Sequence, residues 1–332
     1  MNLDEFWEHI FSEKAERVNL AWQPLGVDER ASVRHLLAQI VVDPERIAAQ
    51  RVAAQYALGV TTGGDFTLPD GALEFARELA QRTGRRLKEA SGGLVASTKK
   101  DGTLVTASDI EADHRLGEEI KTRYPDHSVL SEEGDKVYGG NEWCWVIDPI
   151  DGTTNFAWGY PGWGVLIGLL HYGQPVLGVA DFPPFGRQYY AVRGKGAWRS
   201  TENVEVPIHA AGDRKLTSTQ LFAVGTRSLK GGKWRIPCKL RLPGSSGFDF
   251  ALLSGGECVG AYDSTVHVWD IAALWPLLVE SGAQVVTNHA GDVFPLRSGK
   301  DYSSVEFAVV GAATSELLRE SLALLSDRFA AA

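Results

Sequence analysis

Two spacings of apolar residues divide this sequence into helical and strand-like segments. Apolar residues at helical intervals predict helices over 28–42, over 43–59 with Asp43-Pro44 at its start, and over 72–90. From residue 143 onward, short apolar runs separated by turn residues predict strands, and the second half alternates strands with helices, which is typical of an α/β fold. The segments predicted in this part are 143–147, 164–171, 174–181, 188–192, 221–224, 246–254, 258–263, 269–281, 283–287, 305–311 and 314–329.

The N-terminal part differs from the rest because it shows no motif that suggests chemistry. At 332 residues the chain is long for one compact core, and the loop-like segment 61–71 is rich in glycine. We therefore predict that residues 1–70 form a helical N-terminal extension that packs against the catalytic body.

Composition and charge exclude several classes of protein. A hydrophobic content of 44% and a charged content of 23% are ordinary for a globular protein, and a net charge of −9 argues against nucleic-acid binding. No apolar run reaches about 18 residues and the N-terminus is acidic, so neither a membrane span nor a signal peptide is predicted and cytoplasm is the expected location. Three widely spaced cysteines, Cys144, Cys238 and Cys258, predict buried free thiols.

The stretch with the clearest chemistry is WVIDPIDGTTNF at 145–156. An apolar strand ends there in two carboxylates three residues apart, Asp148 and Asp151, followed by Gly152, which permits a tight turn. Together with the carbonyl oxygen of Ile150, these carboxylates can converge as the hard oxygen ligands that Mg²⁺ prefers. The alternative is an ordinary acidic turn built from Asp-Pro and Asp-Gly.

Other acidic positions have a structural and a functional interpretation. A predicted strand over 128–131 leads into Glu132 and Glu133, and adjacent side chains of an extended segment point to opposite faces, so only one glutamate can face Asp148 and Asp151. Asp109 opens a predicted helix, where an aspartate is also a common cap. Asp270 at a helix start has the same two interpretations. Gly244 and Ser245 precede a helix and could offer backbone N–H groups to an anion or simply cap it.

Five motifs follow one another along the chain: KKDGTLVTASD at 99–109, SEEG at 131–134, the string at 145–156, RGKGAW at 193–198 and VWDIAALWPLLVESGA at 268–283. Taken together, these motifs resemble the inositol monophosphatase family of Mg²⁺-dependent phosphomonoesterases. The resemblance runs in order from about residue 73 to the C-terminus and implies a layered αβαβα sandwich, an α/β (α+β) fold that is normally a homodimer. Residues 71–200 would form an α+β metal-binding half, and residues 201–332 an α/β half that completes the active site.

The resemblance also implies a role for each site residue. Two or three Mg²⁺ ions would be held by Glu132, Asp148, Asp151, Asp270 and the carbonyl of Ile150. Asp109 and Thr153 would form the catalytic pair that orients or deprotonates the metal-activated water, which attacks phosphorus directly. Substrate contacts would come from Gly152, Thr153, Gly244, Ser245, Asp263 and Asp270, with Lys99 and Glu133 in supporting positions.

The expected partner is a small phosphate monoester, and the favoured substrate is inositol 1-phosphate or a similar polyol phosphate. Histidinol phosphate is the alternative, because the segments KKDGT at 99–103 and AALWPLLVESGA at 272–283 also resemble histidinol-phosphate phosphatases. Asp263 stands where inositol-phosphate relatives usually carry glutamate. A fructose-1,6-bisphosphatase and a non-catalytic binding module of the same fold rank below both.

Overall fold

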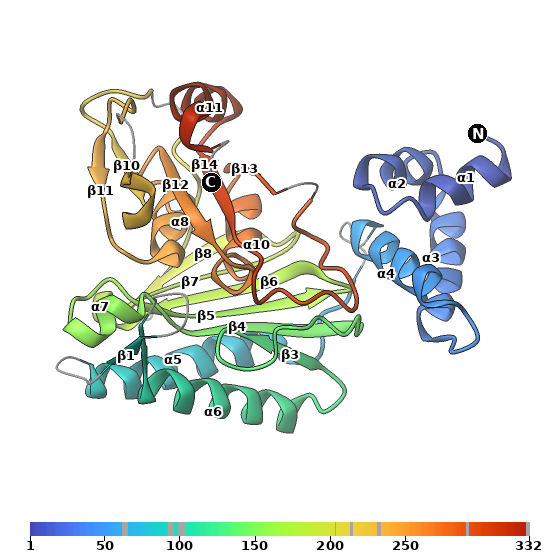
Figure 1. The fold of residues 1–332 in the computed structure, drawn as a ribbon, viewed down its shortest axis with the longest axis horizontal. Coiled ribbons are helices and arrows are strands. Elements are labelled where there is room, and N and C mark those ends of the chain that lie inside the picture. The colour runs from blue at the N-terminus through green and yellow to red at the C-terminus, as the bar shows by residue number, and fades with distance from the viewer. Residues whose placement is uncertain are drawn as a thin grey trace.

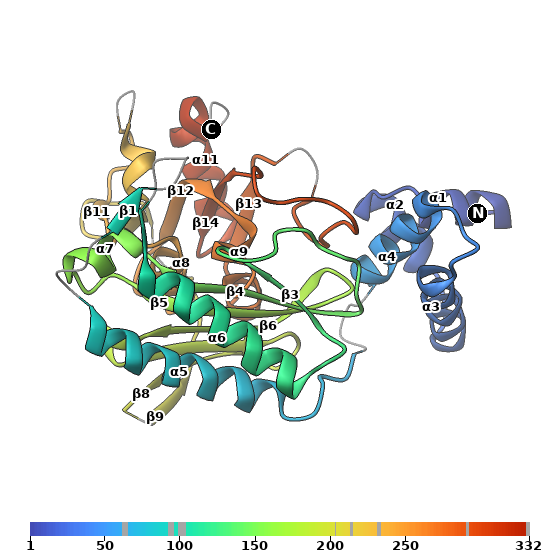
Figure 2. The same ribbon diagram turned by 60° about the horizontal axis from the view of Figure 1, so that its bottom comes forward.

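The chain begins with four helices that enclose a small apolar core of their own. The computed structural model describes residues 1–61, 66–91, 96–98, 104–202, 204–212, 215–230, 234–289 and 292–329. Figures 1 and 2 show the four helices to one side of a layered body. Asn2 caps the first helix by accepting a hydrogen bond from the backbone N–H of Glu5, and Ile10, Val18 and Leu37 are buried between the helices. These helices are α1 (Leu3–Ile10), α2 (Ala15–Trp22), α3 (Val27–Val42) and α4 (Ala48–Thr61).

The body consists of five layers, as predicted (Figure 1). A seven-stranded sheet, in the order β3-β4-β5-β6-β7-β8-β9, is covered on one face by α5 (Ala72–Ala90) and α6 (Ala107–Arg123), which lie side by side in Figure 2. Its strands are β3 (Ser128–Ser131), β4 (Trp143–Asp151), β5 (Gly164–His171), β6 (Gln174–Phe182), β7 (Arg187–Val192), β8 (Ala197–Thr201) and β9 (Val204–Pro207).

The opposite face of this sheet packs on a central helix layer, followed by a second sheet and the last helix. Most of the apolar core lies between the two sheets, around α8 (Ser246–Ser254) and α10 (Leu274–Glu280). The second sheet has the order β11-β10-β12-β14-β13, and α11 (Ser315–Phe329) covers it. Its strands are β10 (Leu221–Val224), β11 (Lys239–Arg241), β12 (Gly260–Val266), β13 (Gln284–Thr287) and β14 (Phe307–Ala312).

Short elements complete the body, and one predicted helix is wrong. The segment 269–281 forms two helices instead of one, because Pro276 lacks an N–H and its ring would clash with a carbonyl of the preceding turn. The short elements are the hairpin β1 (Ala96–Thr98) and β2 (Leu104–Thr106), the helices α7 (Thr153–Trp158) and α9 (Val268–Ile271), and the 3₁₀ turns η1 (Pro183–Phe185) and η2 (Thr226–Leu229).

Sheet register brings distant acidic residues to one edge. β3 pairs in parallel with β4, with Ser131 opposite Ile147, so Glu132 leaves its strand beside Asp148. β4 pairs with β5 antiparallel, and the register shifts between Asp148 and Asp151, after which Asp151 pairs with Gly164. A similar shift in β12 follows Asp263. These irregularities free side chains at the strand ends from regular sheet packing.

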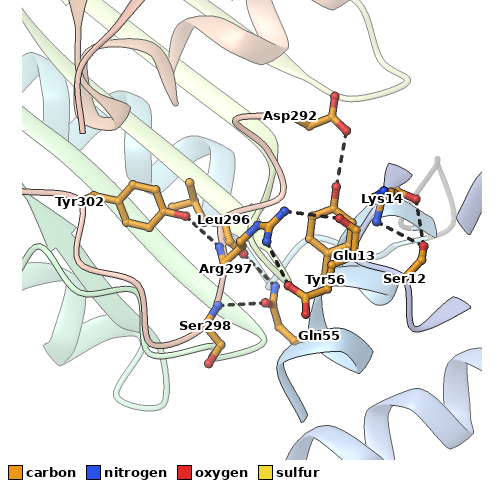
Figure 3. Close-up of polar contacts among 10 residues, drawn as sticks. All are labelled: Ser12, Glu13, Lys14, Gln55, Tyr56, Asp292, Leu296, Arg297, Ser298 and Tyr302. Carbon is orange, nitrogen blue, oxygen red and sulfur yellow. Dashed lines mark hydrogen bonds and ion pairs between the residues drawn. The ribbon is translucent and has the colours of Figure 1, made fainter. Parts of the chain in front are cut away.

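The N-terminal helices are attached to the body through a fully buried side chain, that of Gln55 in α4 (Figure 3). Its Nε2 donates to the carbonyl oxygens of Tyr172 at 2.5 Å and Leu296 at 3.1 Å, and its Oε1 accepts from the backbone N–H of Ser298 at 3.2 Å. Nearby, Arg297 pairs with Glu13 at 3.1 Å. The extension therefore docks on the segment 292–302, which joins β13 to β14.

The cysteine prediction is confirmed, since Cys144, Cys238 and Cys258 are all free and buried. Within the part of the chain that the structure describes, no helix is both long and apolar enough to cross a membrane.

Candidate active site

A polar cavity of about 420 Å³ opens where the ends of β4, β10 and β12 meet the starts of α7, α8 and α9. The strands supply carboxylates, and the helix starts supply backbone N–H groups and hydroxyls. All of the predicted metal and substrate positions line this cavity: Glu132, Asp148, Ile150, Asp151, Gly152, Thr153, Gly244, Ser245, Asp263 and Asp270.

The carboxylates of this cavity are held close enough to perturb one another. Asp148 is 1% exposed, and burial raises its pKa well above the usual value, an effect that the charges of Glu132, Asp151 and Asp270 increase. Its Oδ1 accepts a hydrogen bond from the N–H of Ile150 at 3.0 Å. Burial and the charge of Asp151 likewise raise the pKa of Asp270. Mutual repulsion of this kind disfavours an ionised cluster unless positive charge is added.

Asp151 is tied to the start of α8. Its Oδ2 accepts hydrogen bonds from the hydroxyl of Ser245 and from the backbone N–H of Gly247, the latter at 2.8 Å. Burial raises the pKa of Asp151 to about 7, and these two hydrogen bonds oppose that rise. Ser245 is also the N-cap of α8, accepting from the N–H of Phe248 at 3.1 Å. Ser245 thus caps α8, as the structural interpretation predicts, and also contacts the acidic motif.

Asp109 likewise combines a capping contact with a contact to the motif. Its Oδ2 accepts from the backbone N–H of Thr106 at 2.8 Å and closes the first turn of α6. Its Oδ1 accepts from the hydroxyl of Thr153 at 3.1 Å. Asp109 is 1% exposed and does not line the cavity, so it reaches the site only through Thr153.

The two glutamates after β3 differ as the alternation of an extended segment predicts. Glu132 lines the cavity and Glu133 does not. The backbone N–H of Glu132 donates to the carbonyl of Ile147 at 3.3 Å, which keeps this residue against β4. Lys99, predicted in a supporting position, lies outside the described residues.

Asp263, in β12, also lines the cavity and is engaged by its neighbours. Its Oδ2 accepts from the hydroxyl of Ser246 at 2.7 Å, and its Oδ1 accepts from the backbone N–H of Thr265 at 3.1 Å. Burial raises the pKa of Asp263, while these hydrogen bonds and the charge of Arg227 oppose the rise.

Sequence reasoning missed the cations of this site. Among the described residues that line the cavity, the lysines and arginines are Lys136 and Arg227. Arg227 follows a predicted strand by three residues, and in α/β folds pockets form beyond the carboxyl ends of strands, so its position carried a usable signal. Lys136 belongs to an irregular segment, and its ammonium group lies 5.8 Å from the centre of the Trp269 ring.

A positioning residue was missed as well. The Nδ2 of Asn155 donates to the carbonyls of Gly162 at 2.5 Å and Pro243 at 2.7 Å. It thereby links the helix after the acidic motif to the loop that carries Gly244 and Ser245.

The donor set fits magnesium by chemical type. Four carboxylates and a carbonyl are hard oxygen ligands, and a divalent cation would offset the repulsion that raises the pKa values of Asp148 and Asp270. Within the described ranges, no three acidic, histidine or cysteine side chains come together tightly enough to form a ready-made metal cage. The match to Mg²⁺ therefore rests on the oxygen type of the donor atoms and on their negative charge.

Residues 69–326 match the model of the inositol monophosphatase family. The chain belongs to this family. It is 32% identical over 215 residues to a histidinol-phosphatase from Chlorobaculum parvum, covering 63% of this chain and 83% of that protein. It is 28% identical over 266 residues to inositol monophosphatase 1 from Homo sapiens, covering 76% of this chain and 92% of that protein.

Solved structures agree on the fold. The suhB protein of Bartonella henselae superposes with a TM-score of 0.65 at 23% identity, covering 77% of this chain and 98% of that chain. SuhB of Mycobacterium tuberculosis gives a TM-score of 0.62 at 25% identity and covers 78% of this chain and 97% of that chain. The fold is therefore that of the inositol monophosphatase family, and the family match leaves residues 1–68 outside it.

Proposed function

We propose that this protein is a Mg²⁺-dependent phosphatase that hydrolyses a small phosphate monoester, with inositol 1-phosphate or a similar polyol phosphate as the favoured substrate. The observation that carries the proposal is the hydrogen bond between Thr153 and Asp109 at the edge of a cavity lined by Glu132, Asp148, Asp151 and Asp270. The acidic cluster of this cavity is suited to bind cations, and the adjacent pair of Thr153 and Asp109 is suited to activate a water molecule.

The acidic cluster would hold two or three Mg²⁺ ions through Glu132, Asp148, Asp151, Asp270 and the carbonyl of Ile150. When bound, Mg²⁺ supplies positive charge that offsets the charge of the phosphate and lowers the pKa of the attacking water.

The protein groups would orient the reactants and move the proton. The Thr153 hydroxyl lies 3.1 Å from both the Oδ1 of Asp109 and the carbonyl oxygen of Ile150, and it donates toward these two acceptors, so its lone pairs are available to accept a hydrogen bond from the attacking water. Asp109 can then receive the proton through this hydroxyl at Oδ1. Gly152 precedes α7 with a positive φ of 89°, and backbone N–H groups at this helix start are suited to bind phosphate oxygens.

Substrate choice would be decided at Asp263 in β12 and at Gly244 and Ser245 before α8. A polyol offers hydroxyl donors to the remaining lone pairs of Asp263. Histidinol phosphate is the second candidate, since its ammonium group would pair with this carboxylate and a relative 32% identical to this chain is a histidinol-phosphatase. The neighbouring charge of Arg227 disfavours a cation there, which supports the polyol.

A non-catalytic binding role ranks below both candidates. Such a module has no need to retain the acidic cluster, and all four of the implied ligand carboxylates are present here. We further propose a homodimer, which the family resemblance supports, and a cytoplasmic location, with which three free buried thiols are consistent. Light scattering would test the dimer.

The deciding experiment is a phosphate-release screen with and without Mg²⁺, using inositol 1-phosphate, histidinol phosphate and fructose 1,6-bisphosphate. We expect Mg²⁺-dependent turnover that is fastest on inositol 1-phosphate. Turnover that persists in chelator, or that is absent on every ester, would overturn the proposal. Faster turnover on histidinol phosphate would replace the first substrate by the second.

A further inference from the structure

The acidic end of the cavity contains a cation that the proposed reaction does not use, Lys136. Its side chain is partly buried and lines the cavity, and its ammonium group lies 5.8 Å from the centre of the Trp269 ring. Trp269 is itself buried, lines the same cavity and directly precedes Asp270, one of the four clustered carboxylates. The positive charge is therefore held beside the part of the cavity that carries the negative charges.

The backbone that carries Lys136 is fixed by the segment 292–302. The carbonyl of Lys136 accepts a hydrogen bond from the N–H of Tyr302 at 2.9 Å. Two residues later, the N–H of Tyr138 donates to the carbonyl of Lys300 at 3.1 Å. Because the main chain is held on this side, binding an anion at the ammonium group requires ordering of the lysine side chain alone.

No described carboxylate neutralises this ammonium group, since none lies within 4.0 Å of it. Asp113 is near enough for an electrostatic effect, because burial raises its pKa and the charge of Lys136 opposes the rise. The carboxylate of Asp113 is bonded instead to Ser131 and to the backbone of Glu133. A lysine ammonium is a compact charge with three donors on a flexible stem, so it can turn toward an anion that enters the cavity.

The phosphate group of an ester enters this cavity against a strong negative field. Burial and the repulsion among the four carboxylates raise the pKa values of Asp148 and Asp270. Mg²⁺ offsets this charge when it is bound, and a lysine in the same cavity offsets a further part of it. Because every phosphate monoester carries the same group, a contact from Lys136 would serve inositol 1-phosphate and histidinol phosphate alike.

We propose that Lys136 binds the phosphate group of the substrate and of the product. This inference rests on the proposed function and adds to its machinery a positive charge that belongs to the protein and not to the metal. Loss of this charge has two opposite effects. Phosphate binds more weakly because a charge-assisted contact is removed, whereas Mg²⁺ binds more tightly because a neighbouring positive charge no longer repels it.

Lys136→Met tests the role, because methionine keeps an unbranched side chain against the Trp269 ring and removes the charge. Lys136→Arg keeps the charge. Lys300→Met is the matched control, since the ammonium group of Lys300 also lies over an aromatic ring, 5.0 Å from the centre of Tyr302, and this lysine does not line the cavity. For each protein we would measure kcat and KM with inositol 1-phosphate, inhibition by inorganic phosphate, and Mg²⁺ affinity by calorimetry without substrate.

We expect Lys136→Met to raise KM and the inhibition constant of phosphate about tenfold or more, as loss of a charge-assisted hydrogen bond implies, with a smaller change in kcat. Its affinity for Mg²⁺ should increase about threefold or more. Lys136→Arg should stay within about threefold of wild type, and Lys300→Met within about twofold, in every measurement.

Three results would overturn the role of Lys136. They are unchanged phosphate inhibition in Lys136→Met, an equal effect in the Lys300→Met control, and weaker Mg²⁺ binding by Lys136→Met. The last result separates charge from structure, because a substitution that merely disturbed the cavity would weaken the binding of both phosphate and Mg²⁺.

Failure of this role and failure of the proposed function give different results. Hydrolysis of inositol 1-phosphate with unchanged phosphate inhibition in Lys136→Met refutes only the role of Lys136. If no ester is hydrolysed, the absent turnover refutes the proposed function, and calorimetric titration of inorganic phosphate in the presence of Mg²⁺ still measures the contact. Weaker binding to Lys136→Met than to wild type would then support the phosphate contact, and equal or absent binding would refute it.

Discussion

Gln55 should be the side chain on which docking of the N-terminal helices depends most. It is fully buried and makes three hydrogen bonds, all to backbone groups of the body. Replacement by methionine keeps the length of the side chain and its helix propensity but removes every one of these bonds. The carbonyls of Tyr172 and Leu296 and the N–H of Ser298 would then be left without this partner (Figure 3).

The magnitude follows from these three contacts. A hydrogen bond contributes about 1 kcal/mol net, so three give about 3 kcal/mol, and leaving buried partners unpaired costs more than the bond itself. We therefore expect Gln55→Met to weaken docking of the helices by about 3 to 5 kcal/mol. Detachment also exposes apolar surface around Gly59, where an added Cβ would stand 2.4 Å from the Cβ of Pro295.

Hydrogen exchange and limited proteolysis of α1 to α4 measure this docking directly, and thermal unfolding measures its effect on the whole chain. Gln50→Met is the matched control, because Gln50 lies in the same helix and is exposed. Gln55 does not line the cavity, so kcat/KM should stay near the wild-type value at temperatures at which the variant remains folded. Equal protection of the helices in the two variants, or a loss below about 1 kcal/mol, would refute the reasoning.

Three other changes test the remaining parts of the account. Asp148→Asn should abolish Mg²⁺-dependent phosphate release and weaken Mg²⁺ binding in calorimetry while leaving thermal unfolding cooperative, whereas near-normal turnover would contradict the role of the acidic cluster. Asp263→Asn should cost little with inositol 1-phosphate but roughly 1.5–3 kcal/mol, tenfold or more in kcat/KM, with histidinol phosphate; equal losses would show that no cation pairs with this carboxylate. Burial raises the pKa of Asp181 to about 7, so the folded protein binds this proton more tightly than the unfolded chain, and stability is lost as pH rises from about 4 to about 7. Asp181→Asn should remove up to about 4 kcal/mol of that loss and raise the melting temperature at pH 8. If the free energy of unfolding depended on pH in the same way in the variant as in the wild type, the raised pKa of Asp181 would be contradicted.

The sequence by itself determined the elements whose signals are local. Apolar spacing located α3, α4, α5 and most strands, because burial of one face repeats at the period of the element. The change from apolar residues to Asp148 and Asp151 is also a local signal, and it marked the acidic motif. Alternation along β3 separated Glu132, which lines the cavity, from Glu133, which does not.

Tertiary packing alone decided which distant residues meet. Gln55 reads as a polar position on a helix, and its burial depends on carbonyls 117 and 241 residues away. Ser245 and Asp151 are 94 residues apart, and their bond arises from the meeting of two sheets across α8. The same meeting brings Arg227 to the cavity beside Asp263. A periodic pattern reports only whether a side chain is buried, and the partner it is buried against depends on sheet order and layer packing, which no local pattern encodes.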